Sequence, residues 1–133
     1  MAEFVDIRDA VMTQLKTNWT TTKIKWPGDS KFVPDNNSFW VEPRVIPINA
    51  ENASLGSSHQ RYTGWVRLHI RGPKGHKSGD RQLHVYADSL AAIFRNQSFS
   101  GVRCWVPSQP QVFAGALWQE AAISVPFRYD KIT

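Results

Sequence analysis

The clearest alternation of apolar and polar positions lies in residues 61–71. The apolar side chains of this segment occupy even positions: Tyr62, Val66, Leu68 and Ile70. Most of its odd positions are polar or basic: Arg61, Thr63, Arg67, His69 and Arg71. Because successive side chains of a β-strand point to opposite faces, the segment is predicted to be a half-buried strand with a basic outer face.

The residues that follow predict a loop and then a helix. Residues 72–79 contain Pro73, which lacks an amide donor, and three glycines, which favour loop conformations. Asp80 is suited to cap the N-terminus of a helix. The apolar residues after it recur at spacings of three and four, as on one face of a helix: Leu83, Tyr86, Ala87, Leu90, Ala91 and Phe94.

The same two periodicities locate the remaining elements. A stripe of Phe4, Ile7, Val11 and Leu15 predicts a helix over residues 3–16. Alternation predicts strands over residues 22–26, 39–48, 102–106 and 117–129. The intervening residues 29–38, 49–60, 96–101 and 111–116 are predicted to be loops or turns.

Two prolines distinguish the strand predicted over residues 39–48. Pro43 and Pro47 each remove an amide donor from the hydrogen-bond ladder. The strand is therefore predicted to lie at a sheet edge, or to direct these positions away from its neighbour.

The order of these elements predicts the fold class. A chain of 133 residues is long enough for one hydrophobic core and short for two, and no internal repeat divides it. We therefore expect a single α+β domain over residues 1–133. The sheet is predicted to be mixed but mainly antiparallel, with about four to five strands, and two helices are expected to pack on one of its faces.

The composition is typical of a globular protein, since 41% of the residues are hydrophobic and 20% are charged. No run approaches the roughly 18 apolar residues of a membrane span, and the first residues are acidic, unlike those of a signal peptide. We therefore expect a protein that folds in the cytoplasm and makes no contact with a membrane.

Charge and cysteine content narrow the possible partners only slightly. The net charge of +5 permits contact with nucleic acid or with an acidic protein surface, and no polybasic tail is present. The single cysteine, Cys104, excludes an internal disulfide and a cysteine-based zinc site. Cys104 shares a strand face with Val102 and Val106, which predicts a buried core residue.

A strand, a glycine-containing loop and a helix also form the setting of a phosphate-binding loop. That motif requires glycine directly before the lysine and four residues between its two glycines. Here His76 precedes Lys77, and only two residues separate Gly72 from Gly75. The segment is therefore predicted to be a basic loop without a nucleotide site.

No other pattern predicts catalysis. The four histidines lack the paired spacing of metal ligands: His59, His69, His76 and His84. The serines lack a nucleophile-elbow motif, and carboxylates such as Glu42, Asp88 and Glu120 fall on faces predicted to be exposed and solvated. We therefore expect no enzymatic activity and no cofactor.

Large aromatic residues are predicted on the outer faces of three strands. Trp40, Trp65 and Trp118 fall on the parity opposite to the apolar core positions. Such residues indicate a covered surface, so either a partner subunit covers them or the parity of one strand is wrong.

Several short motifs accompany this layout: Phe-Val-Asp-Ile-Arg-Asp-Ala at 4–10, Phe-Trp-Val at 39–41, Arg-x-x-Gly-x-Val-x-Leu at 61–68, Leu-x-x-Ile-Phe at 90–94 and Val-Pro-Phe-Arg-Tyr at 125–129. Together with the proline-bearing loop before residue 39 and the glycine-containing loop, they cover nearly the whole chain. This layout resembles that of the phage tail-terminator family.

The resemblance implies a structural virion protein that is assembled in the host cytoplasm and forms a hexameric ring at the junction of tail and neck. Such a ring caps the tail tube, ends its polymerisation and presents a surface to the head-neck connector. Subunit contacts are expected through Trp40, Trp65, Trp118 and Arg44. Contacts with the tube protein, or with DNA in the channel, are expected through the basic face: Arg67, His69, Arg71, Lys74, His76 and Lys77.

Two other interpretations stay open. The protein could be a head-closure or connector protein of the neck. It could also be a nucleic-acid-binding module with Tyr62 and Trp65 stacking on bases. The phosphate contacts of such a module are expected to be Arg67, His69, Arg71, Lys74, Lys77 and Arg81.

Overall fold

The computed structural model of the protein describes residues 3–28, 32, 38–52, 59–73, 79–114 and 118–132. Its two helices are α1 (Glu3–Asn18) and α2 (Gly79–Phe94). Its strands are β1 (Lys23–Ile24), β2 (Trp40–Asn52), β3 (His59–Pro73), β4 (Ser98–Phe99), β5 (Val102–Cys104), β6 (Gln111–Ala114) and β7 (Trp118–Ile132). The predicted loop at residues 29–38 lies largely outside the described residues.

All the strands form one mixed sheet in the order β1-β2-β3-β7-β5-β4, and β6 also pairs with β7. The short pair β1–β2 is parallel, whereas the other pairs are antiparallel. The α+β class is confirmed, but the prediction of four to five strands is wrong because the sheet has seven. The additional strands, β4 and β6, are too short to produce a readable alternation in the sequence.

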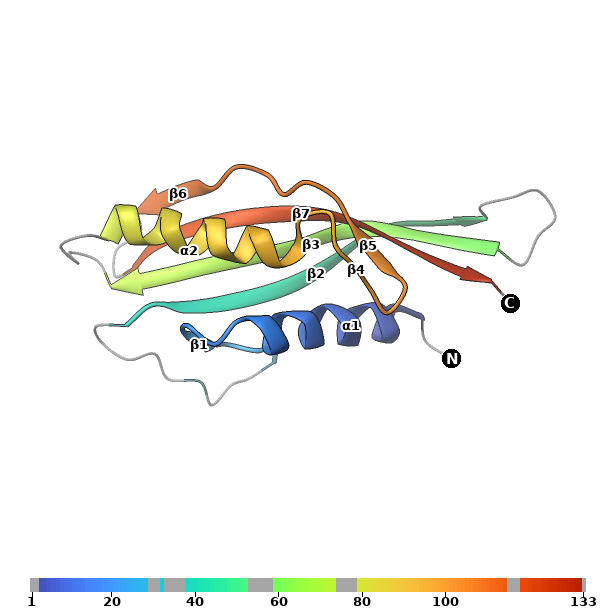
Figure 1. The fold of residues 1–133 in the computed structure, drawn as a ribbon, viewed down its shortest axis with the longest axis horizontal. Helices are drawn as coiled ribbons and strands as arrows, with labels where there is room; N and C mark the ends of the chain where they lie inside the picture. Colours follow the sequence, from blue (N-terminus) through green and yellow to red (C-terminus); the bar gives the residue numbers. More distant parts are fainter. Residues whose placement is uncertain are drawn as a thin grey trace.

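Both helices cover the same face of the sheet. The stripe of α1 and the stripe of α2 meet the inward side chains of β2, β3, β5 and β7 in one hydrophobic core. Phe94, Leu68 and Ile123 are among its fully buried members. Burial of each such side chain contributes about 1.5–3 kcal/mol. Figure 1 shows α1 and α2 on one side of the long strands, with the paired ends of β2, β3 and β7 extending past both helices.

Cys104 lies in this core, as predicted. Burial raises the pKa of its thiol to about 12, so the thiol is protonated at neutral pH and is a poor nucleophile. It contributes to packing.

Three predicted loops are shorter than the sequence pattern suggested. Residues 49–52 and 59–60 belong to the β2–β3 hairpin, residues 72–73 continue β3 opposite β7, and residues 111–114 form β6. Hydrogen bonds between backbones hold these segments in the sheet whatever their side chains are. The strands therefore continue through polar residues and Pro73, where the side-chain pattern predicted that they end. Asp80 lies in the first turn of α2, one residue after its start, instead of preceding the helix.

The prolines of β2 face the free edge of the sheet. The carbonyl of Val41 accepts a hydrogen bond of 2.7 Å from the amide of Lys25, which follows β1. The backbone groups of Val41 therefore point away from β3, and those of Pro43, Val45 and Pro47 do too, because the direction alternates along a strand. The prediction that these positions point away from the neighbouring strand is confirmed, and the β2–β3 ladder loses no donor to them.

A tight approach of backbone and ring requires glycine at position 64. A Cβ atom there would lie 2.2 Å from the carbonyl oxygen of Ile46 and 2.9 Å from the ring of Phe127. Gly64→Ala is therefore expected to lower the free energy of unfolding by about 1–3 kcal/mol, because β2 or the core must shift. Urea denaturation measures this loss. An unchanged midpoint would mean that the β-bulge between Pro47 and Asn49 takes up the strain at no cost.

Candidate interaction surface

The face of the sheet opposite the helices carries a groove of about 650 Å³. We call it the outer groove, and it is lined by Ile46, Ile48, Trp65, Arg67, His69, Ser108, Gln111, Phe113, Glu120, Ala122 and Ser124. These residues come from β2, β3, β6, β7 and the segment before β6, so the groove crosses most of the sheet. Strand alternation builds it, because the even positions of β3 enter the core while the odd ones face the groove.

Large apolar side chains make the outer groove unusual for a solvent-facing surface. Trp65 is 40% exposed, Phe113 is 51% exposed and Ile48 is 61% exposed. The prediction that Trp65 lies on the outer face is confirmed by its register opposite Ile46 and Pro126. Exposed aromatic residues that line one concave surface are typical of a surface that a partner covers.

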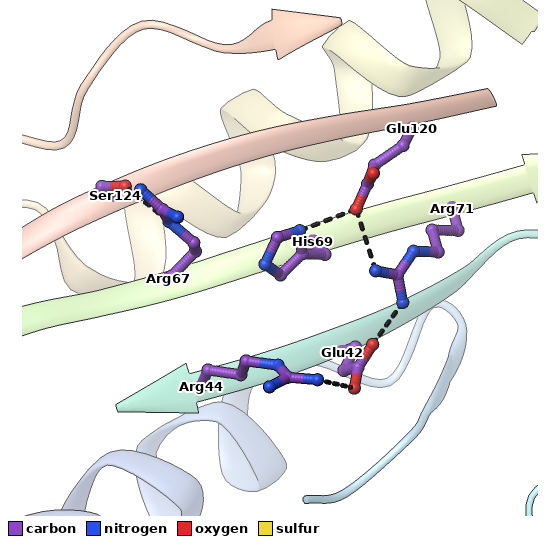
Figure 2. Close-up of polar contacts among 7 residues, drawn as sticks. All are labelled: Glu42, Arg44, Arg67, His69, Arg71, Glu120 and Ser124. Carbon is purple, nitrogen blue, oxygen red and sulfur yellow. Dashed lines mark hydrogen bonds and ion pairs between the residues drawn. The ribbon is translucent and has the colours of Figure 1, made fainter. Parts of the chain in front are cut away.

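Beside the apolar part lies a network of charged side chains, drawn in Figure 2. The carboxylate of Glu42 accepts hydrogen bonds from Arg71 and, at 3.1 Å, from Arg44. The guanidinium of Arg71 lies 3.1 Å from an oxygen of Glu120, and Nδ1 of His69 lies 2.7 Å from that same oxygen. The network therefore ties β2, β3 and β7 together on their outer face.

Glu42 is the only buried charged residue in the described part of the chain. Burial alone would raise the pKa of its carboxyl, but hydrogen bonds and charge attraction from Arg71 and then Arg44 outweigh that effect. The pKa of Glu42 is consequently lowered, and the carboxylate stays ionised between the two guanidiniums at neutral pH.

This network corrects the expectation of solvated carboxylates at Glu42 and Glu120. Glu42 is buried and Glu120 is half-buried, and both pair with Arg71 of the predicted basic face. Arg67 contacts only a hydroxyl in this cluster, donating a hydrogen bond of 3.3 Å to Ser124. Among the described residues of this cluster, the exposed guanidiniums are therefore those of Arg67 and Arg44. The side chain of Arg44 is 60% exposed.

The structure brings together only part of the predicted set. Arg44, Arg67, His69 and Arg71 lie in or beside the outer groove, on one face. Lys74, His76 and Lys77 lie outside the described residues. Sequence reasoning missed the roles of Glu42, Glu120 and Phe113. The signal for the two carboxylates was that they fall on the outer-face positions of their own strands, as the arginines of β3 do, but only the register places them together.

Trp40 and Trp118 occupy the outer face, as predicted, at the end of the sheet near β1. Trp40 is 6% exposed because the chain itself covers it. Its ring contacts those of Phe32 and Trp118 at centroid distances of 5.3 and 6.0 Å, and the guanidinium of Arg71 lies 5.2 Å from its centroid. Trp40 therefore needs no partner subunit to explain its burial, and its role in subunit contact stays a prediction.

A second, smaller ion cluster lies where β3 and β7 extend past the helices. Asp130 lies 2.9 Å from Arg61, 3.2 Å from Arg128 and 3.4 Å from His59. Burial alone would raise the pKa of Asp130, but Arg61, followed by Arg128 and His59, lowers it below its ordinary value. The cluster fastens the two strands side by side.

Within the described ranges, no group of three or more His, Cys, Asp or Glu side chains is arranged to hold a metal ion. None of the described helices is long and apolar enough to cross a membrane. The outer face thus combines an apolar groove, the exposed guanidiniums of Arg44 and Arg67, and carboxylates that are paired within the network.

Comparison with known proteins identifies the family. The model of the phage tail terminator protein family matches residues 6–127, which is nearly the whole chain. The chain belongs to the phage tail terminator family. The resemblance noted in the sequence is thereby confirmed, and the tail terminator family is one of structural proteins of the phage tail, without catalytic function.

One solved structure has a similar fold. It is 22% identical in sequence, the alignment covers 100% of this chain and 99% of that chain, and the TM-score is 0.74. At this identity the likeness concerns the fold alone. A search of curated proteins finds no match.

Proposed function

We propose that this tail terminator forms a ring, with six subunits, that caps the tail tube, ends its polymerisation and provides the surface for joining to the head. The match of the family model over residues 6–127 carries the proposal. Such a ring stands at the tail-neck junction of the virion and is assembled in the host cytoplasm. Its partners are further copies of itself, the tube protein and the connector of the neck.

The outer groove supports the part of the proposal that concerns assembly. A ring closes through head-to-tail contacts, in which one patch of a subunit meets a different patch of the next. The exposed Trp65, Ile48 and Phe113 form one such patch, and the exposed Arg44 stands beside it. The apolar groove provides burial, and the arginines provide orientation.

The charge pattern favours a protein partner over DNA for this face. Glu42 and Glu120 neutralise Arg71 and approach His69, which leaves few free cations for phosphates along the described stripe. Binding of duplex DNA needs several unpaired Lys or Arg side chains. The lysines at positions 74 and 77 extend the basic charge beyond the described part of β3, and we assign them to the contact with the tube.

A tube-capping assay tests the proposal. The purified protein is expected to give a six-subunit species in native mass spectrometry and to stop the growth of tubes when it is added to polymerising tube protein. The double variant Lys74→Glu, Lys77→Glu is expected to form the same ring but to leave tubes growing, because it repels the acidic groups that we expect on the tube. The joining of wild-type rings to tubes should weaken as salt rises, since exposed charges are screened beyond roughly 10 Å at 0.1 M.

Two results would contradict the proposal. A wild-type protein that remains monomeric at every concentration would contradict the proposed ring. Tubes of normal, limited length in the presence of the double lysine variant would remove the joining role of these two residues, while leaving the ring in place.

A further inference from the structure

The first turns of α1 form an exposed patch that the core does not use. Phe4 is 39% exposed and Val5 is 49% exposed, although the helix buries its other apolar side chains in the core. Asp6 and Asp9 are exposed beside them. Val5 and Asp9 are four residues apart and therefore lie on the same side of the helix. We call Phe4, Val5, Asp6 and Asp9 the α1 tip.

The charge of the α1 tip is opposite to that of the outer groove. The tip has two carboxylates, and among the described residues of the first turns of α1 the one cation is Arg8, which lies 3.3 Å from Asp9. The groove has an exposed guanidinium at Arg67, and the exposed Arg44 lies beside it, bonded to Glu42. The two carboxylates there, Glu42 and Glu120, are paired inside the network. Each surface thus combines large apolar side chains with an excess of one charge, negative at the tip and positive at the groove.

The fold keeps most of these two surfaces apart within one chain. α1 packs on the core face of the sheet, whereas Trp65, Arg67 and Phe113 line the groove on the opposite face. Only Ile48, at the edge strand β2, lines both the groove and a hollow beside Phe4. A contact of the α1 tip with Trp65 and Phe113 therefore joins two copies of the chain. Because one patch meets a different patch, a pair of copies still has one free tip and one free groove, and the contact repeats until a ring closes.

We propose that the α1 tip of one subunit docks in the outer groove of the next subunit, with Phe4 and Val5 against Trp65, Ile48 and Phe113, and with Asp6 and Asp9 facing Arg44 and Arg67. This inference rests on the proposed ring and specifies the contact that builds it. The apolar side chains supply the affinity, and the charges set the direction of docking.

Mixing two variants tests the contact. Val5→Lys places a cation where the tip meets arginines, and Trp65→Asp places an anion where the groove meets aspartates. Each variant alone is expected to be monomeric at a concentration at which the wild-type protein is fully assembled. Mixed together, they are expected to give a heterodimer containing one copy of each, because the intact tip of the Trp65→Asp protein fits the intact groove of the Val5→Lys protein. Native mass spectrometry resolves these species by mass.

Val85 provides a matched control, because it is 37% exposed on α2 and lines neither surface. Val85→Lys and Val85→Asp are expected to assemble as the wild type does. If the Val5→Lys protein forms rings as the wild-type protein does, this would overturn the inference and leave the proposed function standing. Two monomeric variants that give no heterodimer on mixing would overturn it too. A wild-type protein that forms no ring would overturn the inference together with the proposed function.

Discussion

Replacing Trp65 by aspartate is expected to leave the protein folded and to abolish the association of its subunits. Trp65 is 40% exposed on the outer face, so its removal takes no side chain from the hydrophobic core. In the assembled ring, the aspartate would have to give up its water in an apolar groove. Loss of a central aromatic residue at an interface costs about 4 kcal/mol, which weakens each contact about a thousandfold.

Analytical ultracentrifugation measures this association, and circular dichroism with thermal melting reports on the fold. Val85→Asp controls for the introduction of a charge at a similarly exposed apolar site on α2. It is expected to sediment as the wild-type protein does. An unchanged oligomer for the Trp65 variant would exclude the outer groove as the subunit contact. Loss of the folded structure in this variant would show instead that Trp65 is needed for folding.

Replacing Glu42 by glutamine is expected to lower the free energy of unfolding by about 2–3 kcal/mol at neutral pH. The side chain of Glu42 is 7% exposed, and its carboxylate holds the guanidiniums of Arg71 and Arg44. Removing one partner of a buried pair weakens the compensation of the other charge, although Arg71 keeps its contact with Glu120. Most of the loss falls on Arg71, which is 25% exposed, since the side chain of Arg44 is 60% exposed and regains water.

The pH dependence of this difference follows from the direction of the pKa shift. Burial would raise the pKa of Glu42, but Arg71 and Arg44 lower it below the ordinary value of 4.5. A carboxyl with a lowered pKa in the folded state contributes its full stability above its unfolded pKa. The contribution disappears as the pH falls through the lower, folded pKa. The stability gap between wild type and Glu42→Gln should therefore be constant above about pH 5 and shrink in acid.

Urea denaturation at a series of pH values measures this gap. Asp88→Asn is the matched control, because Asp88 is an exposed carboxylate on α2. It is expected to change stability by no more than about 0.5 kcal/mol at any of these pH values. A gap for Glu42→Gln that persists unchanged in strong acid would mean that packing of the side chain, and not its charge, is what the substitution removes.

The long elements of the fold were predictable because each buries one face. The stripe of α2 and the alternation of β3 and β7 gave their positions and their inward residues, including Leu68 and Ile123. Elements that bury no such face were not predicted from the sequence. β6 lies at an edge with Val112 and Phe113 exposed, and the distal ends of β2 and β3 pair through their backbones beyond the hydrophobic core. Side-chain periodicity carries no information about strands of that kind.

The sequence pattern predicted which face of the sheet carries the site residues, but not which side chains they contact. Alternation placed Arg67, His69, Arg71 and Trp65 together on the outer side of β3. Their neighbours come from other strands, and the contact between Glu42 and Arg71 depends on a register that no local pattern specifies. Trp40 illustrates the same limit, because Phe32, which packs on it, belongs to a segment without periodicity.

The prolines of β2 have a consequence for how this protein behaves at high concentration. Positions 43, 45 and 47 are the ones directed to the open edge, so only Val45 offers an amide donor there between residues 42 and 47. A strand approaching from solvent would find carbonyl acceptors but almost no donors, and could not complete a ladder. The β2 edge is thereby protected from adding a strand of another copy. Pro43 and Pro47 thus prevent strand pairing at this part of the β2 edge without weakening the β2–β3 ladder.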